Sequence, residues 1–327
     1  MYSKQPTPSL VGVITSPMRK SFLFAHIMWD FLESDFFTFA VPNTAFGIFS
    51  AFASSVLIEG PSSLVPSPPK MQILRRLPHA LAFNVANLLV FTLANQRTPE
   101  SVEEDRINKP WRPIPQGRIT IEQTRRVMLA AIPATVTLNH ALGVERQGVL
   151  ILLLTWLYND LGGGDEAFLR EIIISIAYGL YNSGSLTVAL GPEYHALSSR
   201  GTTWVVVISG VILTTMQVQD LKDQEGDKTR DRKTIALFLG EHISRASPAF
   251  FVCFWSCVCA HFWVLELVQL ALLAIIAVVL VIRLLSVRLS FEGNAHTWRF
   301  WCFWHSSLYI LPLLAARGSK KDHIYAT

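Results

Sequence analysis

The sequence predicts an all-α protein that is embedded in a membrane as a bundle of about nine transmembrane helices. Hydrophobic residues make up 51% of the 327 residues and charged residues only 16%, a balance outside that of soluble domains. Apolar stretches also recur along the chain, each long enough, or nearly long enough, to cross a bilayer of about 30 Å. The net charge of +4 fits a membrane surface or an anionic substrate, and no nucleic-acid partner is expected.

The apolar stretches divide the chain into one membrane domain and two flanking segments. The predicted helices span 36–58, 80–95, 125–143, 147–161, 171–190, 203–219, 247–265, 268–285 and 299–316. Several contain proline, which a helix bundle tolerates where neighbouring helices satisfy the backbone. Residues 1–35 are then expected to be an N-terminal cytosolic segment, 36–316 a single transmembrane catalytic domain and 317–327 a C-terminal tail.

The basic residues predict the orientation of this multi-pass domain. With nine crossings, the N-terminus shares one side with the loops after the second, fourth, sixth and eighth helices. That side carries 20 of the 28 lysines and arginines, and the opposite side carries 8. By the positive-inside rule, the first side is expected to face the cytosol.

Two stretches are conspicuously polar for so apolar a chain, and both are expected as loops on the cytosolic side. The first runs from Asn95 to Pro113 and contains Glu100, Glu103, Glu104, Asp105, Asn108, Lys109 and Arg112. The second follows the sixth predicted helix and contains Asp220, Lys222, Asp223, Gly226, Asp227, Lys228, Arg230, Arg232 and Lys233. An even number of crossings separates the two stretches, so they can face one another.

The three aspartates of the second stretch have the spacing of a metal-binding face. Asp220, Asp223 and Asp227 stand at i, i+3 and i+7, which on a helix is a single face. Carboxylates so close repel one another unless a cation neutralises them, and hard oxygen ligands select Mg²⁺, which also bridges to phosphate oxygens. A solvated helix end with alternating charges is the alternative, and the second polar cluster on the same side weighs against it.

Together the two stretches resemble the motifs of the UbiA superfamily of membrane prenyltransferases. The stretch from Asn95 to Pro113 resembles the first motif, in which an Asn-initiated Asp pair is followed by Asn, a basic residue and Pro. The second motif is matched in full by Asp220, Asp223, Gly226 and Asp227. The resemblance implies a helical bundle with a central cavity for a prenyl diphosphate, and it extends over nearly the whole chain.

The first motif departs from the family pattern at its middle position. The family places an Asp midway between the Asn and the final Asp, whereas here Ser101 stands four residues before Asp105. A nearby glutamate, Glu100, Glu103 or Glu104, can substitute for the missing carboxylate. The sequence does not decide which of the three binds metal.

The resemblance implies a magnesium-dependent ionisation of the diphosphate. The implied metal ligands are Asp105, Glu104, Asp220, Asp223 and Asp227. The implied partners of the substrate are Asn95, Lys109, Arg112, Lys222 and Lys228. Metal and cations would stabilise the charge on the leaving diphosphate, and the apolar interior would hold the prenyl chain and keep water from the carbocation.

Other polar residues are weaker candidates for the cavity. Tyr158 and Asn159 end the fourth predicted helix on the motif side, where they can line the cavity mouth or serve as a helix cap and turn. Tyr178, Tyr181 and Asn182 are polar residues within the apolar fifth predicted helix, where they can point into the bundle, and polar groups inside a membrane are often functional. We expect the first pair to contact the substrate.

The sequence leaves the fate of the carbocation open. In the first hypothesis, the cation of farnesyl or geranylgeranyl diphosphate alkylates a small aromatic or pyrone-type acceptor in secondary metabolism. In the second, the protein is a membrane terpene cyclase that converts farnesyl diphosphate to a cyclic sesquiterpene, an activity known in the fungal branch of the family. A non-catalytic transporter is the third hypothesis, although its polar breaks would be expected near the bilayer midplane. Family frequency alone favours transfer.

Overall fold

The computed structural model describes residues 10–58, 68–193, 197–230, 232–286 and 291–316. Within these ranges all regular elements are helices joined by short loops, and the one extended pairing is an isolated antiparallel bridge between Ile58 and Leu197. The first part comprises α1 (Leu10–Asp35), the π-helical turn η1 (Phe36–Ala40), α2 (Val41–Phe52), α3 (Ser54–Leu57), α4 (Lys70–Gln96), α5 (Pro99–Asn108) and α6 (Ile121–Ala141). The second part comprises α7 (Glu145–Asn159), η2 (Gly163–Asp165), α8 (Ala167–Leu190), α9 (Ser199–Thr215), η3 (Met216–Gln219) and α10 (Asp220–Thr229). The last part comprises α11 (Ile235–Leu239), α12 (Glu241–Trp263), α13 (Leu267–Leu285) and α14 (Phe291–Leu308).

The all-α prediction is confirmed for the part of the chain described above, and the membrane character is supported by five spans. Among the described residues, the helices long and apolar enough to cross a membrane are Lys70–Gln96, Ala167–Leu190, Ser199–Thr229, Glu241–Trp263 and Leu267–Leu285. α7 has only 15 residues, which is short for a crossing of about 20. The nine crossings therefore stay a prediction.

Two predicted helix starts were wrong by ten residues or more. The first helix does not begin at residue 36, because α1 continues through η1 into α2 without a loop, so the segment placed before the bundle is helical from Leu10. The second helix begins at Lys70 and not at residue 80. Arg75, Arg76 and His79 break the apolar pattern there without breaking the helix.

α8 lies at the centre of the bundle, in contact with α2, α4, α7 and α9. α2 and α8 approach closely at Gly47, where a Cβ atom would stand 2.6 Å from the backbone of Ser185. Small residues allow such approaches between membrane helices, and polar side chains then join the helices. One such link is Asn84 on α4, which donates to the hydroxyl oxygens of Thr44 at 3.0 Å and Ser185 at 2.8 Å.

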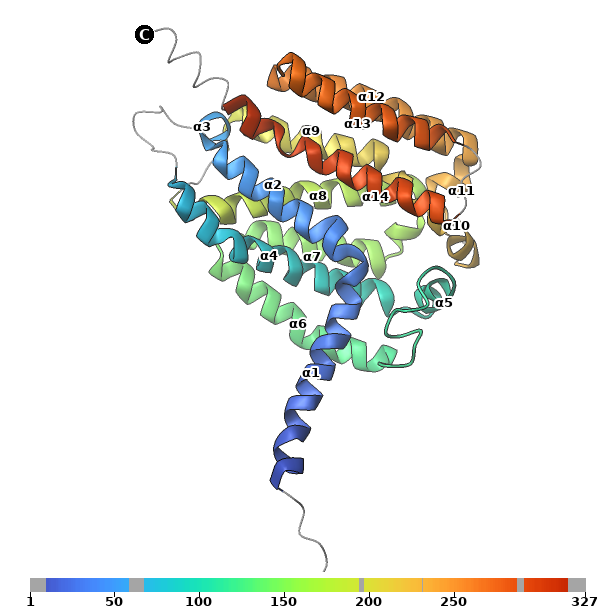
Figure 1. Ribbon diagram of the computed structural model, residues 1–327. Helices are drawn as coiled ribbons and strands as arrows, with labels where there is room; N and C mark the ends of the chain where they lie inside the picture. Colours follow the sequence, from blue (N-terminus) through green and yellow to red (C-terminus); the bar gives the residue numbers. More distant parts are fainter. Residues whose placement is uncertain (1–9, 59–67, 194–196, 231, 287–290, 317–327) are drawn as a thin grey trace, which may run out of the picture.

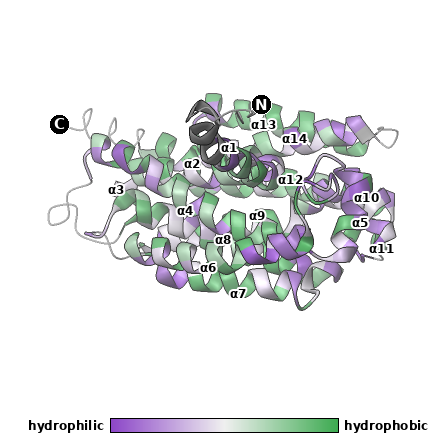
Figure 2. Ribbon diagram, turned by 90° about the horizontal axis from the view of Figure 1, so that it is seen from below, coloured by the Kyte–Doolittle hydropathy of each residue, from purple (hydrophilic) through white to green (hydrophobic). Residues whose placement is uncertain are grey.

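The two motif segments meet at one end of the bundle. Figure 1 shows α5 and α10 side by side at the ends of the long helices, and they contact each other directly. Hydrophilic residues gather on α5 and α10 in Figure 2, whereas the long helices are largely hydrophobic. This arrangement brings the two polar stretches face to face, as the even number of crossings between them predicted.

Candidate active site

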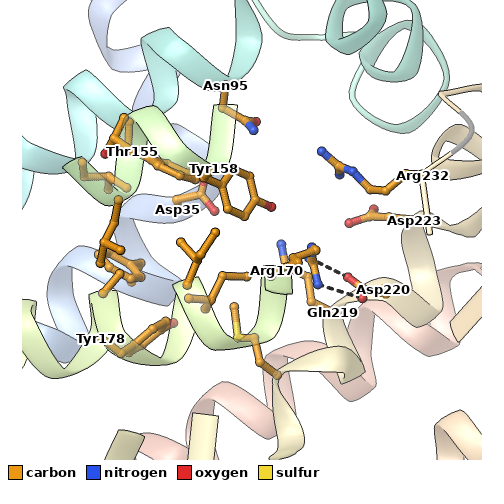
Figure 3. Close-up of a pocket in the computed structure, with 18 of the residues that line it drawn as sticks. Asp35, Asn95, Thr155, Tyr158, Arg170, Tyr178, Gln219, Asp220, Asp223 and Arg232 are labelled. Carbon is orange, nitrogen blue, oxygen red and sulfur yellow. Dashed lines mark hydrogen bonds and ion pairs between the residues drawn. The ribbon is translucent and has the colours of Figure 1, made fainter. Parts of the chain in front are cut away.

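A cavity opens at this end of the bundle, and its space, including the part open to solvent, is about 1020 Å³. α4, α7 and α8 supply most of its wall, and residues of α1, η1, α5, η3, α10 and the segment after each motif helix complete it. One side carries charged residues and the other is apolar and aromatic. Figure 3 shows Asp220, Asp223, Arg170 and Arg232 on the charged side and Tyr178 away from them. The cavity therefore suits a molecule with one anionic end and a hydrocarbon body.

The carboxylates of the second motif share one face of a helix. Asp220, Asp223 and Asp227 lie on α10, all three are buried, and all three line the cavity. The helical spacing predicted from the sequence is thus confirmed.

Each of these carboxylates is paired with a basic side chain. Arg170 of α8 donates to both oxygens of Asp220, at 2.8 and 2.9 Å, in a planar two-point contact. Asp223 accepts from the Nζ of Lys222 at 2.5 Å, and Asp227 accepts from Arg232 at 3.4 Å. These cations reduce the repulsion among the three carboxylates.

The first motif is a helix, α5, and not the predicted loop. Thr98 caps its N-terminus by accepting from the backbone N–H of Ser101, and Pro99 occupies the first turn, where a missing N–H costs nothing. Of the three glutamates that the sequence left open, Glu100 and Glu103 are exposed, whereas Glu104 is buried and lines the cavity. Glu104 accepts from Arg230 at 3.2 Å and from Arg232 at 3.3 Å.

Asp105 occupies a different place from the other motif carboxylates. It is buried beside the cavity and is not among the residues that line it. Both of its oxygens accept from Nη1 of Arg112, at 2.7 and 2.9 Å. Burial opposes the charge on Arg112, but the carboxylates of Asp105 and Asp35 outweigh it and raise the pKa of the guanidinium. Asp105 therefore fixes a permanently cationic Arg112 at the cavity wall.

α5 and α10 are joined by one asparagine. The side chain of Asn108 accepts from the backbone N–H of Gly226 at 3.1 Å and donates to the carbonyl of Asp223 at 2.9 Å. A Cβ atom on Gly226 would lie 2.3 Å from Nδ2 of Asn108, so only glycine allows this contact. The joint holds the two motif helices in register.

The remaining predicted substrate contacts separate into two groups. Asn95, Lys109 and Tyr158 line the cavity, as does Arg112. Asn159 does not line it, but accepts from Asn95 Nδ2 at 3.1 Å and so orients that side chain. Lys222 reaches the cavity only through Asp223.

Lys228 is exposed and lies away from the cavity wall. Lys228 directly follows Asp227 on α10, so its side chain lies on a different face of the helix from the three aspartates, which face the cavity. The structure therefore does not bring Lys228 together with the other predicted contacts.

Several cavity residues were missed at the sequence level. Arg170 was passed over, although a charged pair, Arg170 and Glu171, at the start of an apolar helix is a recognisable signal of an interior polar site. Asp35 and Gln219 also line the cavity. Tyr178 and Tyr181 line it too, which supports their expected inward orientation.

The donor set fits Mg²⁺ in its chemistry. Among the described residues, no three His, Cys, Asp or Glu side chains are gathered tightly enough to form a metal site by themselves. Mg²⁺ usually takes only one or two carboxylates and completes its shell with water and phosphate oxygens. The buried oxygens of Asp220, Asp223, Asp227 and Glu104 at the charged side of the cavity meet that requirement.

Comparison with known proteins identifies relatives of this chain. A family model described as the UbiA prenyltransferase family matches residues 81–308. The fumagillin β-trans-bergamotene synthase of Aspergillus fumigatus is 30% identical over 178 residues, which are 53% of this chain and 59% of that protein. In Hericium erinaceus, a diterpene cyclase is 32% identical over 54% of this chain and 55% of its own length. A polyprenyl transferase of the same organism is 33% identical over 47% of this chain and 52% of its own length.

The fold has solved counterparts. A structure of a UbiA homologue from Archaeoglobus fulgidus bound to GPP and Mg²⁺ superposes with a TM-score of 0.56, covering 86% of this chain and 99% of that one, at 9% identity. This likeness shows a shared fold. The curated relatives above are matched over little more than half of their length, so their activities are not transferred with the match.

Proposed function

The chain belongs to the UbiA prenyltransferase family, and we propose that it is a magnesium-dependent membrane enzyme that ionises a polyprenyl diphosphate of farnesyl or geranylgeranyl length. One observation carries the proposal. The three aspartates of α10 lie buried on one face at the charged side of a cavity whose other side is apolar and aromatic. A prenyl diphosphate matches this cavity, because its diphosphate is anionic and its hydrocarbon chain is apolar.

The motif carboxylates would hold the metal. The proposed ligands are Glu104, Asp220, Asp223 and Asp227. Bound there, Mg²⁺ supplies positive charge to the diphosphate oxygens, which stabilises the leaving group.

The basic residues of this chain would bind the rest of the diphosphate. Lys109, Arg112, Arg170 and Arg232 all line the charged side, so they surround the position of the leaving group. Arg112 and Arg170 are held by Asp105 and Asp220 before substrate arrives, which removes the need to order flexible side chains during the reaction. Lys222 would act next to them through its contact with Asp223.

The apolar wall would bind the prenyl chain and exclude water. Ile173, Ile174 and Leu154 line the cavity beside Phe91 and Tyr181. Water captures an allylic cation within the site unless it is kept out, so a wall of mostly apolar side chains protects the cation. The membrane-spanning helices around it are consistent with a multi-pass protein, and we propose that the motif end faces the cytosol.

Cyclisation is the fate of the cation that we favour, which reverses the order that the sequence alone suggested. The cavity presents aromatic faces from Phe39, Phe91, Tyr178 and Tyr181, and such faces stabilise a cation as it moves along a folded chain. Two of the three relatives described above are named as a β-trans-bergamotene synthase and a diterpene cyclase. Transfer to a small aromatic or pyrone-type acceptor is the second candidate, and the relative named as a polyprenyl transferase favours it.

Incubation without an acceptor tests both levels of the proposal. Membranes containing the protein are given farnesyl or geranylgeranyl diphosphate and Mg²⁺, and released diphosphate and extracted hydrocarbons are measured. We expect diphosphate release that stops when EDTA removes the metal, together with a cyclic hydrocarbon. A product that forms only when an aromatic or pyrone acceptor is added would assign transfer instead. No diphosphate release in either condition would overturn the ionisation.

A further inference from the structure

The segment that joins α1 to α2 reaches the cavity, although it lies outside the residues that the family match covers. That match begins at residue 81, whereas Asp35 ends α1 and Phe39 lies in the π-helical turn η1. Both side chains line the cavity. Single π-helical turns in otherwise α-helical segments frequently occur at functional sites, because the extra residue changes which side chains face inward.

The carboxylate of Asp35 is free to act, unlike the carboxylates of the motifs. Its side chain makes no capping hydrogen bond to η1. Its one ion pair in the described structure is with Arg112 Nη2 at 4.0 Å, a long contact, while Arg112 already holds Asp105 at 2.7 Å. The Asp35 side chain is 28% exposed, in contrast to 2% for Asp105. A small molecule in the cavity can therefore reach the Asp35 oxygens.

Asp35 lines the same cavity as Tyr178, Asp220 and Asp223. In the view of Figure 3 it is drawn beside Tyr158. Phe39, four residues on, packs edge-on against Tyr178 and Tyr181, with ring centroids 4.7 Å apart in each pair. Asp35 and this aromatic cluster therefore belong to the same cavity, and Phe39 follows Asp35 in the next element, η1.

We propose that Asp35 is the catalytic base that removes the proton when the carbocation is quenched. The inference rests on the proposed function, since the cation has to form first. In cyclisation, a C–H bond next to the cationic carbon breaks, its electron pair forms a C=C bond, and the proton passes to the carboxylate. In transfer to an aromatic acceptor, the ring C–H bond breaks in the same way and its pair restores the aromatic ring. In both reactions the diphosphate has already left with the electron pair of the C–O bond.

The surroundings of Asp35 suit this step. Arg112 lies near Asp35 with Nη2 4.0 Å from its carboxylate, and the other ionisable groups that interact electrostatically with it are Lys222, Tyr178 and Cys302. The hydroxyl of Tyr178 is buried and has no hydrogen-bond partner among the described residues, so it is available to a ligand in the same part of the cavity. The base thus lies beside the rings that would hold the cation.

The experiment separates ionisation from proton removal in the full-length protein. In Asp35→Asn, we expect diphosphate release from farnesyl or geranylgeranyl diphosphate at close to the wild-type rate, while the wild-type product falls by about 100-fold, the usual contribution of a positioned base. Prenyl alcohol from water capture, or alkenes with the double bond elsewhere, should replace it. Asp35→Glu keeps a carboxylate and should recover part of the native product.

A matched control removes a neighbouring charge. Glu33 is exposed on α1, two residues from Asp35, and Glu33→Gln should keep the wild-type product pattern and rate. An unchanged product in Asp35→Asn would assign the proton to the released diphosphate and overturn the role of Asp35. Loss of diphosphate release in Asp35→Asn would overturn it as well, because the residue would then act in ionisation. A wild type that releases no diphosphate would instead overturn the proposed function.

Discussion

The guanidinium of Arg170 holds both carboxylate oxygens of Asp220, at 2.8 and 2.9 Å, in a fully buried contact between α8 and α10. Arg170 also donates to Glu171 at 2.5 Å, so one cation serves two buried carboxylates. This link connects the central helix of the bundle to the metal-binding face of α10. The same arginine therefore neutralises buried carboxylates inside the bundle and fixes the position of the second motif.

Replacement of Arg170 should damage both stability and substrate binding. Arg170→Met leaves Asp220 and Glu171 buried without a partner, and loss of one member of a buried ion pair costs about 3–5 kcal/mol. We expect a lower midpoint of thermal unfolding in detergent. Arg170→Lys keeps the charge without the planar two-point contact, so it should unfold closer to wild type but show a raised KM for the prenyl diphosphate. A Lys variant with unchanged KM would remove Arg170 from the proposed binding site.

Asp223→Ala should abolish diphosphate release. Asp223 is buried, lines the cavity and belongs to the proposed metal ligands, so its loss should lower the rate by at least about 100-fold. The exposed Glu225, two residues further along α10, gives the control Glu225→Gln, which should retain the wild-type rate. Retained turnover in Asp223→Ala would take this residue out of the site.

Asp105→Ala should also abolish diphosphate release, but through Arg112. The change leaves Arg112 buried with only the distant Asp35 carboxylate, which should cost about 3–5 kcal/mol of folding free energy and release the guanidinium from the cavity wall. A double-mutant cycle with Arg112→Ala checks this reason. The two changes should be strongly non-additive in thermal unfolding, because they remove the same contact. Additive losses would show that Asp105 acts independently of Arg112.

The spacing of acidic residues predicted α10 correctly because a helical face requires only local periodicity. Asp220, Asp223 and Asp227 lie one turn apart, and no tertiary information is needed to place them together. The first motif was harder. Its charged residues hide a short helix, α5, whose stability comes from the Thr98 cap and from contact with α10 and not from an apolar face.

The choice among the glutamates and the role of Asp105 needed the folded chain. Glu104 and Asp105 are neighbours in sequence, yet one faces the cavity and the other faces Arg112, a difference set by the rotation of α5 against α10. The sequence did not place Asp35 at the cavity for a related reason. It lies 60 residues before Asn95, and only the path of α1 and η1 brings it to the same cavity.

Gly226→Ala should separate the two motif helices. Its Cβ would meet three side-chain atoms of Asn108, the nearest at 2.3 Å, and such overpacking typically costs about 1–3 kcal/mol. We expect lower thermal stability and slower diphosphate release, because Asp223 accepts from the same Asn108 side chain at its backbone carbonyl. The three nearest atoms all belong to the Asn108 side chain, so Asn108→Ala combined with Gly226→Ala relieves their clash but does not restore the lost hydrogen bonds. The double variant should therefore be about as stable as Asn108→Ala alone, and a further loss would contradict this account.

Two lysines of α10 give a final contrast. Lys222 is mostly buried and contacts the Asp223 carboxylate at 2.5 Å, whereas Lys228 is exposed outside the cavity. Lys222→Ala should slow diphosphate release, since it removes a cation next to a proposed metal ligand at the leaving group. Lys228→Ala should leave both rate and KM unchanged, although the family resemblance alone assigns it to the substrate. The two variants carry the same change of side chain and charge on one helix, so equal losses in both would mean that net charge at this end of the bundle matters and not the position of each lysine. A loss confined to Lys228→Ala would require α10 to turn a different face to the diphosphate than the one described.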